Sequence, residues 1–439
     1  MKRFFTLILA ILAVMACTPN LEPEGQDPQE PAELAVESEV LSTNTLSLQP
    51  GEKANLTGRV YPDNCKVHSV TWTSSNEGVA TVENGLVTAL AAGEAIITAK
   101  VEDFSVTCTV TVTVPFSYGG MCMEAINSAS LSIYNPNGLA IEYKVENNDW
   151  TSSNGTSINI RANTGERVWF RGRNESYSGV IFRNTSGSFY LYGNLMSLIY
   201  GDDFEDKKEL TAKETFYELF IQNSGIYNHP AKDIELPATT LTTSCYRNMF
   251  YKCPNLKKAM SVLPATELAP NCYTGMFQRA DKLENAPKLP ATELTYSCYS
   301  HMFNGCKALK NAPKLPATKL AEACYQRMFC NTLLTKAPEL PATDMEVGCY
   351  QYMFQNCTEL EKAPVLPATQ LSFWCYGDMF KGCSKLNYIK ALFLNKPSDY
   401  YTPGWVAGVA ENGTLVKNPN ATWDVRGING IPEGWTVEY

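Results

Sequence analysis

Cysteine and histidine are the residues of this chain whose chemistry is most distinctive. The 439 residues include 15 Cys and 3 His, and the three histidines are His68, His229 and His301. So few imidazoles leave little material for a metal cage or an acid–base triad. Fifteen cysteines allow a disulfide framework, metal sites, or small buried apolar side chains. Their spacing has to decide among these three.

Most of the cysteines recur with a period of about 26 residues. Within each repeat one cysteine opens the motif Cys-Tyr-x-x-Met-Phe, and a second usually follows the Met-Phe pair. The first column is Cys245, Cys272, Cys298, Cys324, Cys349 and Cys375, and the second is Cys253, Cys306, Cys357 and Cys383. A period of this length is typical of stacked repeats.

The spacing inside one repeat predicts a short helix followed by a strand. Cys245, Met249, Cys253 and Leu256 lie at i, i+4, i+8 and i+11, which places them on one helical face. The next stretch, such as 283–289, is short and contains proline, so we expect it to be extended. One helical and one extended arm per repeat predict an α/β solenoid over residues 206–395.

On this geometry the cysteines are too far apart to be joined. Two cysteines eight residues apart on a helix are separated by about 12 Å, and neighbours on packed helices by about 8–10 Å. A disulfide needs Cα atoms within about 7 Å. The repeats contain no Cys-x-x-Cys pair and no histidine column, so we expect no metal, no cofactor and free buried thiols. If this arm were extended instead, disulfides between neighbouring repeats would become possible.

His301 is the one repeat histidine with a nucleophile nearby. It follows Cys298 by three residues, a spacing that on a helix would suit a Cys–His pair. Its equivalents in the other repeats vary and are mostly polar: Asn248, Gly275, Arg327, Tyr352 and Asp378. We therefore interpret it as a solvent-facing scaffold position and expect no catalytic residue and no enzyme.

The repeat motif Met-Phe-x-x-Cys-x-x-Leu-x-x-Ala-Pro-x-Leu-Pro-Ala-Thr resembles the BspA-type leucine-rich repeats of bacterial surface proteins. That resemblance implies adhesion or binding of a host protein. The chain departs from the motif at Met260 and Ala280. The repeat that contains Met328 is one residue short, which displaces Cys330.

The predicted extended arms carry a stripe rich in lysine and asparagine. It comprises Lys257, Lys258, Asn285, Lys288, Lys310, Asn311, Lys314, Lys336 and Lys362. On a leucine-rich-repeat horseshoe these side chains would line the inner sheet and suit an acidic protein face or an anionic glycan. The alternative is an ordinary solvated surface.

The N-terminus predicts export. Lys2 and Arg3 precede an apolar run over 4–16 that is too short to span a bilayer. The small residue before Cys17 resembles a lipoprotein lipobox, so residues 1–17 would be a signal peptide ending at a lipidated (palmitate-bearing) Cys17. An ordinary signal peptide is the alternative. Residues 18–35 are acidic and proline-rich, which predicts a tether. The resemblance implies a lipid anchor in the outer membrane of a Gram-negative bacterium, exposed outward, as the only membrane contact.

Residues 36–115 alternate apolar and polar side chains in short runs, which predicts an antiparallel β-sandwich. The runs Val70-Thr-Trp-Thr-Ser-Ser-Asn76 and Thr107-Cys-Thr-Val-Thr-Val112 resemble the group-2 bacterial immunoglobulin-like (Big) domain. In that family the module is usually a spacer and sometimes contacts ligands. Whether Cys65 and Cys108 pair is left open.

Residues 116–205 continue the β pattern and predict a second sandwich. Its aromatic residues Trp150, Trp169, Tyr190 and Tyr192 either form a sugar-stacking platform or fill the core. Residues 396–439 break the repeat and predict a C-terminal cap.

The whole chain is thus expected to be multidomain, with two N-terminal antiparallel β-sandwiches followed by an α/β leucine-rich-repeat solenoid and its cap. The net charge of −9 argues against nucleic acid as a partner. We expect a monomeric, non-catalytic adhesion scaffold on the cell surface that binds a host or bacterial surface protein. Glycan capture by 116–205 is the alternative.

Overall fold

The computed structural model describes residues 38–48, 50–61, 69–91, 93–112 and 119–439. The chain divides into two compact units, Met1–Phe116 and Ser117–Tyr439, and each is described by itself. The predicted signal peptide with Cys17, the tether over 18–35, Cys65 and His68 lie outside the described residues.

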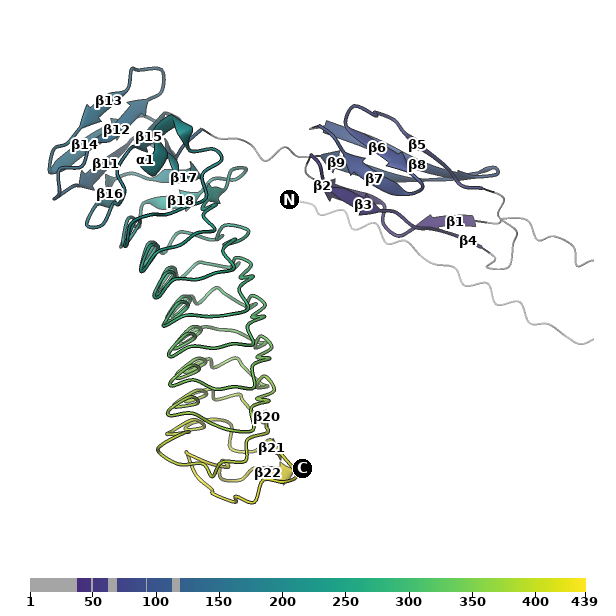
Figure 1. The fold of residues 1–439 in the computed structure, drawn as a ribbon, viewed down its shortest axis with the longest axis vertical. Helices are drawn as coiled ribbons and strands as arrows, with labels where there is room; N and C mark the ends of the chain where they lie inside the picture. Colours follow the sequence, from purple (N-terminus) through teal and green to yellow (C-terminus); the bar gives the residue numbers. More distant parts are fainter. Residues whose placement is uncertain (1–37, 49, 62–68, 92, 113–118) are drawn as a thin grey trace, which may run out of the picture. The chain divides into compact units, whose positions relative to one another are not determined.

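The described residues of the first unit form nine short strands. They are drawn in Figure 1. They are β1 (Ser38–Leu41), β2 (Thr45–Leu48), β3 (Lys53–Asn55), β4 (Gly58–Tyr61), β5 (Thr71–Ser74), β6 (Ala80–Glu83), β7 (Leu86–Ala89), β8 (Gly93–Val101) and β9 (Phe104–Val112). The sheets β2-β9-β8-β5 and β3-β7-β6 are antiparallel except for β2 and β9, and β1 pairs with β4.

Period-2 alternation explains the core of this unit. Along β8 and β9 alternate side chains are buried, and Ile97, Cys108 and Val110 meet Leu56 and Val87 in one cluster. The turn between β6 and β7 has Asn84 and Gly85 at positive φ, as a two-residue hairpin loop requires. A Cβ on Gly85 would lie 2.4 Å from the carbonyl oxygen of Leu56, so only glycine fits there.

The second unit begins with a sandwich of two sheets. Its strands are β10 (Cys122–Ala125), β11 (Ala129–Tyr134), β12 (Ile141–Val145), β13 (Thr151–Ser153), β14 (Ser157–Ala162), β15 (Arg167–Gly172), β16 (Ile181–Ser186) and β17 (Phe189–Asn194). The sheet β14-β11-β16 packs its buried face against that of β13-β12-β15-β10-β17. A single turn of helix, α1 (Ser197–Tyr200), and the 3-10 turn η1 (Gly201–Asp203) follow.

The larger sheet continues directly into the repeats. β17 pairs in parallel with β18 (Ile226–Asn228) and with β19 (Ile234–Glu235). One hydrophobic core runs without interruption from Met121 to Trp435. The sandwich therefore forms one body with the repeats (Figure 1).

The predicted helices are wrong. The arm from Cys245 to Leu256 consists of turns, and within the described chain the α-helical residues are those of α1. Every fourth residue of the arm has a left-handed backbone: φ is 58° at Ser244, 53° at Asn248 and 53° at Lys252. An α-helix cannot pass through such residues, because each of them ends the right-handed turn. The molecule is nearly all β and irregular, and the expected α/β leucine-rich-repeat solenoid is not what this sequence forms.

Backbone hydrogen bonds between consecutive repeats replace the helix. The N–H groups of Tyr246, Asn248 and Phe250 donate to carbonyls of the next repeat, each at 2.9 Å. The residues between them donate three residues back, as Met249 does to Tyr246 at 3.3 Å. On the other arm, isolated parallel bridges such as Lys258 to Asn285 join neighbouring repeats. Figure 1 shows the successive turns lying one on another from β18 to β20 (Tyr388–Ala391).

Two columns of stacked rings run through the repeats. The Tyr246 and Tyr273 rings lie 5.7 Å apart at 3°, and the Phe277 and Phe303 rings 5.9 Å apart at 1°. Each such pair adds about 0.5–1.5 kcal/mol beyond its buried area. At the C-terminal end β20 continues in parallel into β21 (Thr414–Lys417) and β22 (Thr436–Glu438), where the buried rings of Trp405 and Trp423 cover the stack.

Substitution at a left-handed position tests this backbone. Lys252 has φ 53° and donates its N–H to Gln278 of the next repeat at 2.8 Å. Glycine adopts this conformation without strain, whereas a β-branched residue resists it. We expect Lys252→Gly to be at least as stable as the parent and Lys252→Val to be about 1–2 kcal/mol less stable, measured by urea denaturation. Equal effects of the two changes would contradict the left-handed assignment.

The tyrosine column also contains buried hydroxyl groups without partners. Within the described residues, the hydroxyl oxygens of Tyr246, Tyr299 and Tyr325 have no hydrogen-bond partner. A buried, unsatisfied polar group costs about 1–3 kcal/mol. We expect Tyr299→Phe to raise the denaturation midpoint. Tyr177→Phe is the matched control and should lower it, because the Tyr177 hydroxyl donates to the Leu198 carbonyl at 2.9 Å. A fall in both variants would contradict the first expectation.

Candidate functional site

The cysteines have structural roles. All thirteen described cysteines are buried and none of them forms a disulfide. Free buried thiols were expected for the ten cysteines of the two columns, whereas the pairing of Cys108 was left open. Burial raises the pKa of the Cys253 and Cys298 thiols to about 12. Thiols with such a pKa are poor nucleophiles at neutral pH. The second-column thiols of Cys253, Cys306 and Cys383 instead donate to a phenylalanine carbonyl of the preceding repeat, each at 3.0 Å.

The irregular repeats show how this second column tolerates change. Thr332 takes the position of the missing cysteine, and its hydroxyl donates to the Phe329 carbonyl at 2.8 Å and lies 3.3 Å from Cys357 Sγ. Cys330 lies outside the column, where Asn331 donates to its sulfur at 3.0 Å. Ala280 offers no donor at its position. The sequence analysis identified the displaced cysteine but missed the threonine that replaces it.

The reason given for free thiols does not hold, because it assumed helices. Backbones joined by hydrogen bonds, as Tyr246 is to Cys272, lie about 5 Å apart. Distance therefore does not exclude disulfides within the first column, and burial is what protects these thiols.

A thiol count tests this conclusion. In a variant with Cys17 and Cys65 replaced by serine, we expect the folded protein to react slowly with a thiol reagent at pH 8 and the denatured, unreduced protein to expose thirteen thiols. A count that falls below thirteen by an even number would show disulfides between neighbouring repeats.

His301 is partly buried, not solvent-facing. It is one of the left-handed residues, with φ 58°, and its Nδ1 lies 2.8 Å from the Ser300 hydroxyl. Burial, with Arg327 and Arg247 nearby, lowers the pKa of His301 to about 4. The neutral imidazole is hydrogen-bonded to the Ser300 hydroxyl and contributes to the packing of the repeats.

The predicted lysine and asparagine stripe is exposed along one edge of the repeats, which we call the lysine edge. It comprises Lys257, Lys258, Asn285, Lys288, Lys310, Asn311, Lys314, Lys336 and Lys362. The expected inner sheet is absent from described residues 258–362, which are joined there by isolated bridges such as Asn311 to Lys336. Lys258 is paired with Asp233 at 2.8 Å.

Two adjoining hollows open on the lysine edge. One of ≈ 520 Å³ is lined by Asn311, Lys314 and Lys336, and one of ≈ 700 Å³ by Lys336 and Lys362. The rest of their lining comes mainly from the Ala-Pro-x-Leu-Pro segments, whose prolines stand among alanine, leucine and valine residues, together with Thr335, Glu339 and Glu361. The sequence analysis selected the charges and overlooked the prolines, although the repeated Ala-Pro pair was visible. The other residues of the lysine edge do not line these hollows.

The structure places the two tyrosines and the two tryptophans of the predicted aromatic platform in different surroundings. Strand register sets Lys144, Trp169, Cys122 and Tyr192 in one row across β12, β15, β10 and β17, on the face of the sheet away from the main core. Tyr192 is fully buried there beneath Trp169 and Tyr190.

Residues beyond the sandwich cover the two tyrosines. The Tyr192 hydroxyl donates to Glu124 at 2.8 Å and accepts from Lys232 at 3.2 Å. The Tyr190 ring meets the His229 ring at 5.2 Å. These tyrosines therefore pack the sandwich against the first repeat and are not a sugar surface.

The two tryptophans have a different setting. Trp150 and Trp169 line a hollow of ≈ 430 Å³ on the outer face of the sheet, which we call the sheet hollow. Arg171 lies over the Trp150 ring at 4.1 Å and is bound by Glu142 and Asp202. Lys144, Asp202 and Glu205 also line it. Sequence reasoning missed these charged residues, because they come from three separate segments of the chain.

Comparison with known proteins identifies one part of the chain. Residues 35–112 match the family model of the bacterial Ig-like domain (group 2). The expected N-terminal domain is therefore confirmed, and the match agrees with a surface-associated protein. The resemblance of the repeats to BspA-type repeats stays a prediction.

Similar curated proteins match over short segments. They are a lacto-N-biosidase of Bifidobacterium bifidum (39% identical over 97 residues, 22% of this chain and 9% of that protein) and an alpha-L-arabinofuranosidase of Bifidobacterium longum (38% over 91 residues, 20% and 8%). An uncharacterized protein of Clostridium acetobutylicum is 42% identical over 77 residues, 17% of this chain and 8% of that protein. The chain spans less than a tenth of the length of these relatives.

Among solved structures, the S-layer protein SbsC is similar at 18% identity, over 29% of this chain and 21% of that chain, with a TM-score of 0.17. A structure of its domains 5–6 is similar at 14% identity, over 30% and 98%, with a TM-score of 0.17. No helix among the described residues has the length and apolar character needed to cross a membrane. Among the described residues, no group of three or more His, Cys, Asp or Glu side chains is arranged so that it could hold a metal ion.

Proposed function

We propose that this protein is a surface lipoprotein that binds a macromolecular partner, without catalysis, through the lysine edge of its repeats. The observation that carries the proposal is the pair of adjoining hollows on that edge, lined by exposed lysines and by proline rings.

The hollows suit a polypeptide partner. Proline fixes its own backbone angle φ, so the walls between the repeats are shaped before a ligand arrives. Proline rings offer apolar contact, while Lys314, Lys336 and Lys362 offer positive charge. Glu339 and Glu361 interrupt that charge, so the lining favours a partner with acidic groups in a matching pattern over a uniformly anionic polymer.

The remaining parts of the chain would present this edge. Cys17 would carry the lipid anchor in the outer membrane, and the tether and the Ig-like domain would act as spacers that hold the repeats outward. The protein would act as a monomer toward a host or bacterial surface protein.

Charge reversal on the lysine edge tests the proposal. We expect the variant Lys314→Glu, Lys336→Glu, Lys362→Glu, whose three lysines line the hollows, to bind immobilised extracellular-matrix proteins roughly tenfold more weakly at low salt, because charge steers association. The loss should shrink as salt rises. Binding is measured by biolayer interferometry with the full chain.

The matched control reverses three exposed lysines that lie outside both hollows, Lys282, Lys307 and Lys396. It changes the net charge by the same amount and should leave binding unaltered. Equal losses in the two variants, or no binding by the parent to any matrix protein, would reject the lysine edge as the binding surface.

Glycan capture by the second β domain is the other candidate. The observation that favours it is the sheet hollow, which contains both predicted tryptophans beside charged side chains. The tyrosines of the predicted platform do not contribute.

A further inference from the structure

We propose that the sheet hollow holds one neutral pyranose ring of a glycan chain, stacked on Trp150 and hydrogen-bonded to Asp202, Glu205 and Lys144. This inference rests on the glycan-capture candidate and is independent of the lysine edge.

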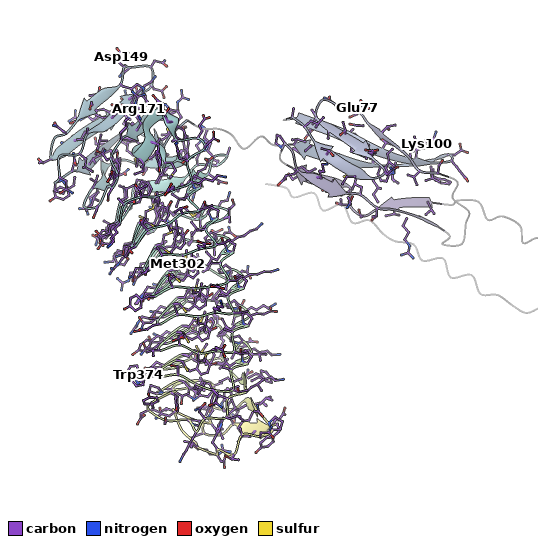
Figure 2. All side chains as sticks on the ribbon, viewed as in Figure 1. Glu77, Lys100, Asp149, Arg171, Met302 and Trp374 are labelled. Carbon is purple, nitrogen blue, oxygen red and sulfur yellow. The ribbon has the colours of Figure 1, made fainter. Side chains whose placement is uncertain are left out.

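The walls of the hollow come from four segments, and three of them supply its charged and aromatic side chains. Lys144 on β12 and Trp169 on β15 are neighbours by strand register. Trp150 lies just before β13 and directly follows Asp149, which is labelled in Figure 2. Arg171 lies on β15 and is labelled in the same view. Asp202 and Glu205 follow α1, the short helix that packs on β15. The site therefore forms only when the sandwich is folded.

The Trp150 ring is fixed by its neighbours before any ligand binds. The residue keeps 37% of its surface exposed, so part of this large apolar ring is open to solvent. Arg171 lies over this ring at 4.1 Å, and Glu142 and Asp202 bind the guanidinium from two sides. A side chain clamped in this way loses little freedom on binding, so the exposed apolar surface is pre-organised.

The polar groups of the lining suit hydroxyl groups. The carboxylates of Asp202 and Glu205 accept hydrogen bonds, and the ammonium of Lys144 donates them. A pyranose has an apolar C–H face for the indole and hydroxyls around its edge, which can both donate and accept. Apolar walls with a few convergent polar groups are the usual form of a small-ligand site, and ≈ 430 Å³ falls in the usual size range.

The charge of the lining selects a neutral sugar. Lys144 and Arg171 carry two positive charges, and Asp202 and Glu205 carry two negative charges, so the lining has no net charge. An acidic or a cationic sugar would therefore meet like charges as well as opposite charges in this lining. Both would lose hydration without a net gain of attraction.

A glycan-binding experiment tests the assignment. The full chain is titrated with neutral glucan, galactan and mannan oligosaccharides, and in parallel with polygalacturonate and heparin oligosaccharides as anionic probes. We expect at least one neutral oligosaccharide to bind and Trp150→Ala to weaken it at least about tenfold. Trp150→Phe should retain part of the affinity, because it keeps an aromatic face.

Tyr134→Ala is the matched control. Tyr134 is an aromatic side chain on β11 of the other sheet, 54% exposed and outside the sheet hollow, so its loss should not change glycan affinity. A urea denaturation midpoint equal to that of the parent shows that Trp150→Ala is folded. The lysine-edge variant should bind glycan like the parent, which separates failure of one site from failure of the other.

Three results would overturn the proposal. They are the absence of binding to every neutral oligosaccharide, binding of anionic glycans alone, and equal affinity of the parent and Trp150→Ala.

Discussion

In the turn-forming arm of each repeat, every second backbone N–H group donates a hydrogen bond to a carbonyl of the next repeat. The rest of this structure depends on these bonds. They require the backbone to turn so that Tyr246, Asn248 and Phe250 all face the following repeat. A left-handed residue at every fourth position makes that possible, at about 1–2 kcal/mol for each residue that is not glycine. Stacked rings and buried thiols offset this cost. The repeat spacing places each aromatic ring on the equivalent ring of the next repeat.

This constraint also aligns the surface. When repeats are joined residue by residue, equivalent side chains form straight columns, and a lysine or a proline in each repeat becomes part of a continuous edge. The hollows on the lysine edge are the spaces between such equivalent proline segments. The sheet hollow depends on register in the same way, since strand pairing sets Lys144 beside Trp169. In both places a backbone ladder decides which side chains are neighbours.

The error in the predicted fold has a specific cause. Positions i, i+4 and i+8 share one face of an α-helix, and they also share one face of a turn structure that repeats every four residues. The apolar pattern of Cys245, Met249 and Cys253 therefore suits both. A signal was present in the residues between them, because asparagine and glycine, which tolerate the left-handed backbone, recur at the positive-φ positions. They include Asn248, Asn271, Gly275, Gly305, Asn331, Asn356 and Gly382. Asn248 and Gly275 belong to the column interpreted above as variable and polar, and the other five were not considered.

By itself the sequence determined what is local or periodic. The alternation of the Ig-like domain, the repeat length and the membership of each cysteine column follow from spacing along the chain, because equivalent residues in a repeat meet the same surroundings. Only the tertiary structure decided what each column touches. The thiol of Cys253 donates a hydrogen bond to a carbonyl of another repeat, and Thr332 takes the place of a cysteine beside Cys357. Tyr192 is buried by the first repeat, whereas Trp150 remains exposed. These contacts join segments about 25 to 70 residues apart, and the side chains that meet over such separations are decided by how the strands and repeats pair in the folded chain.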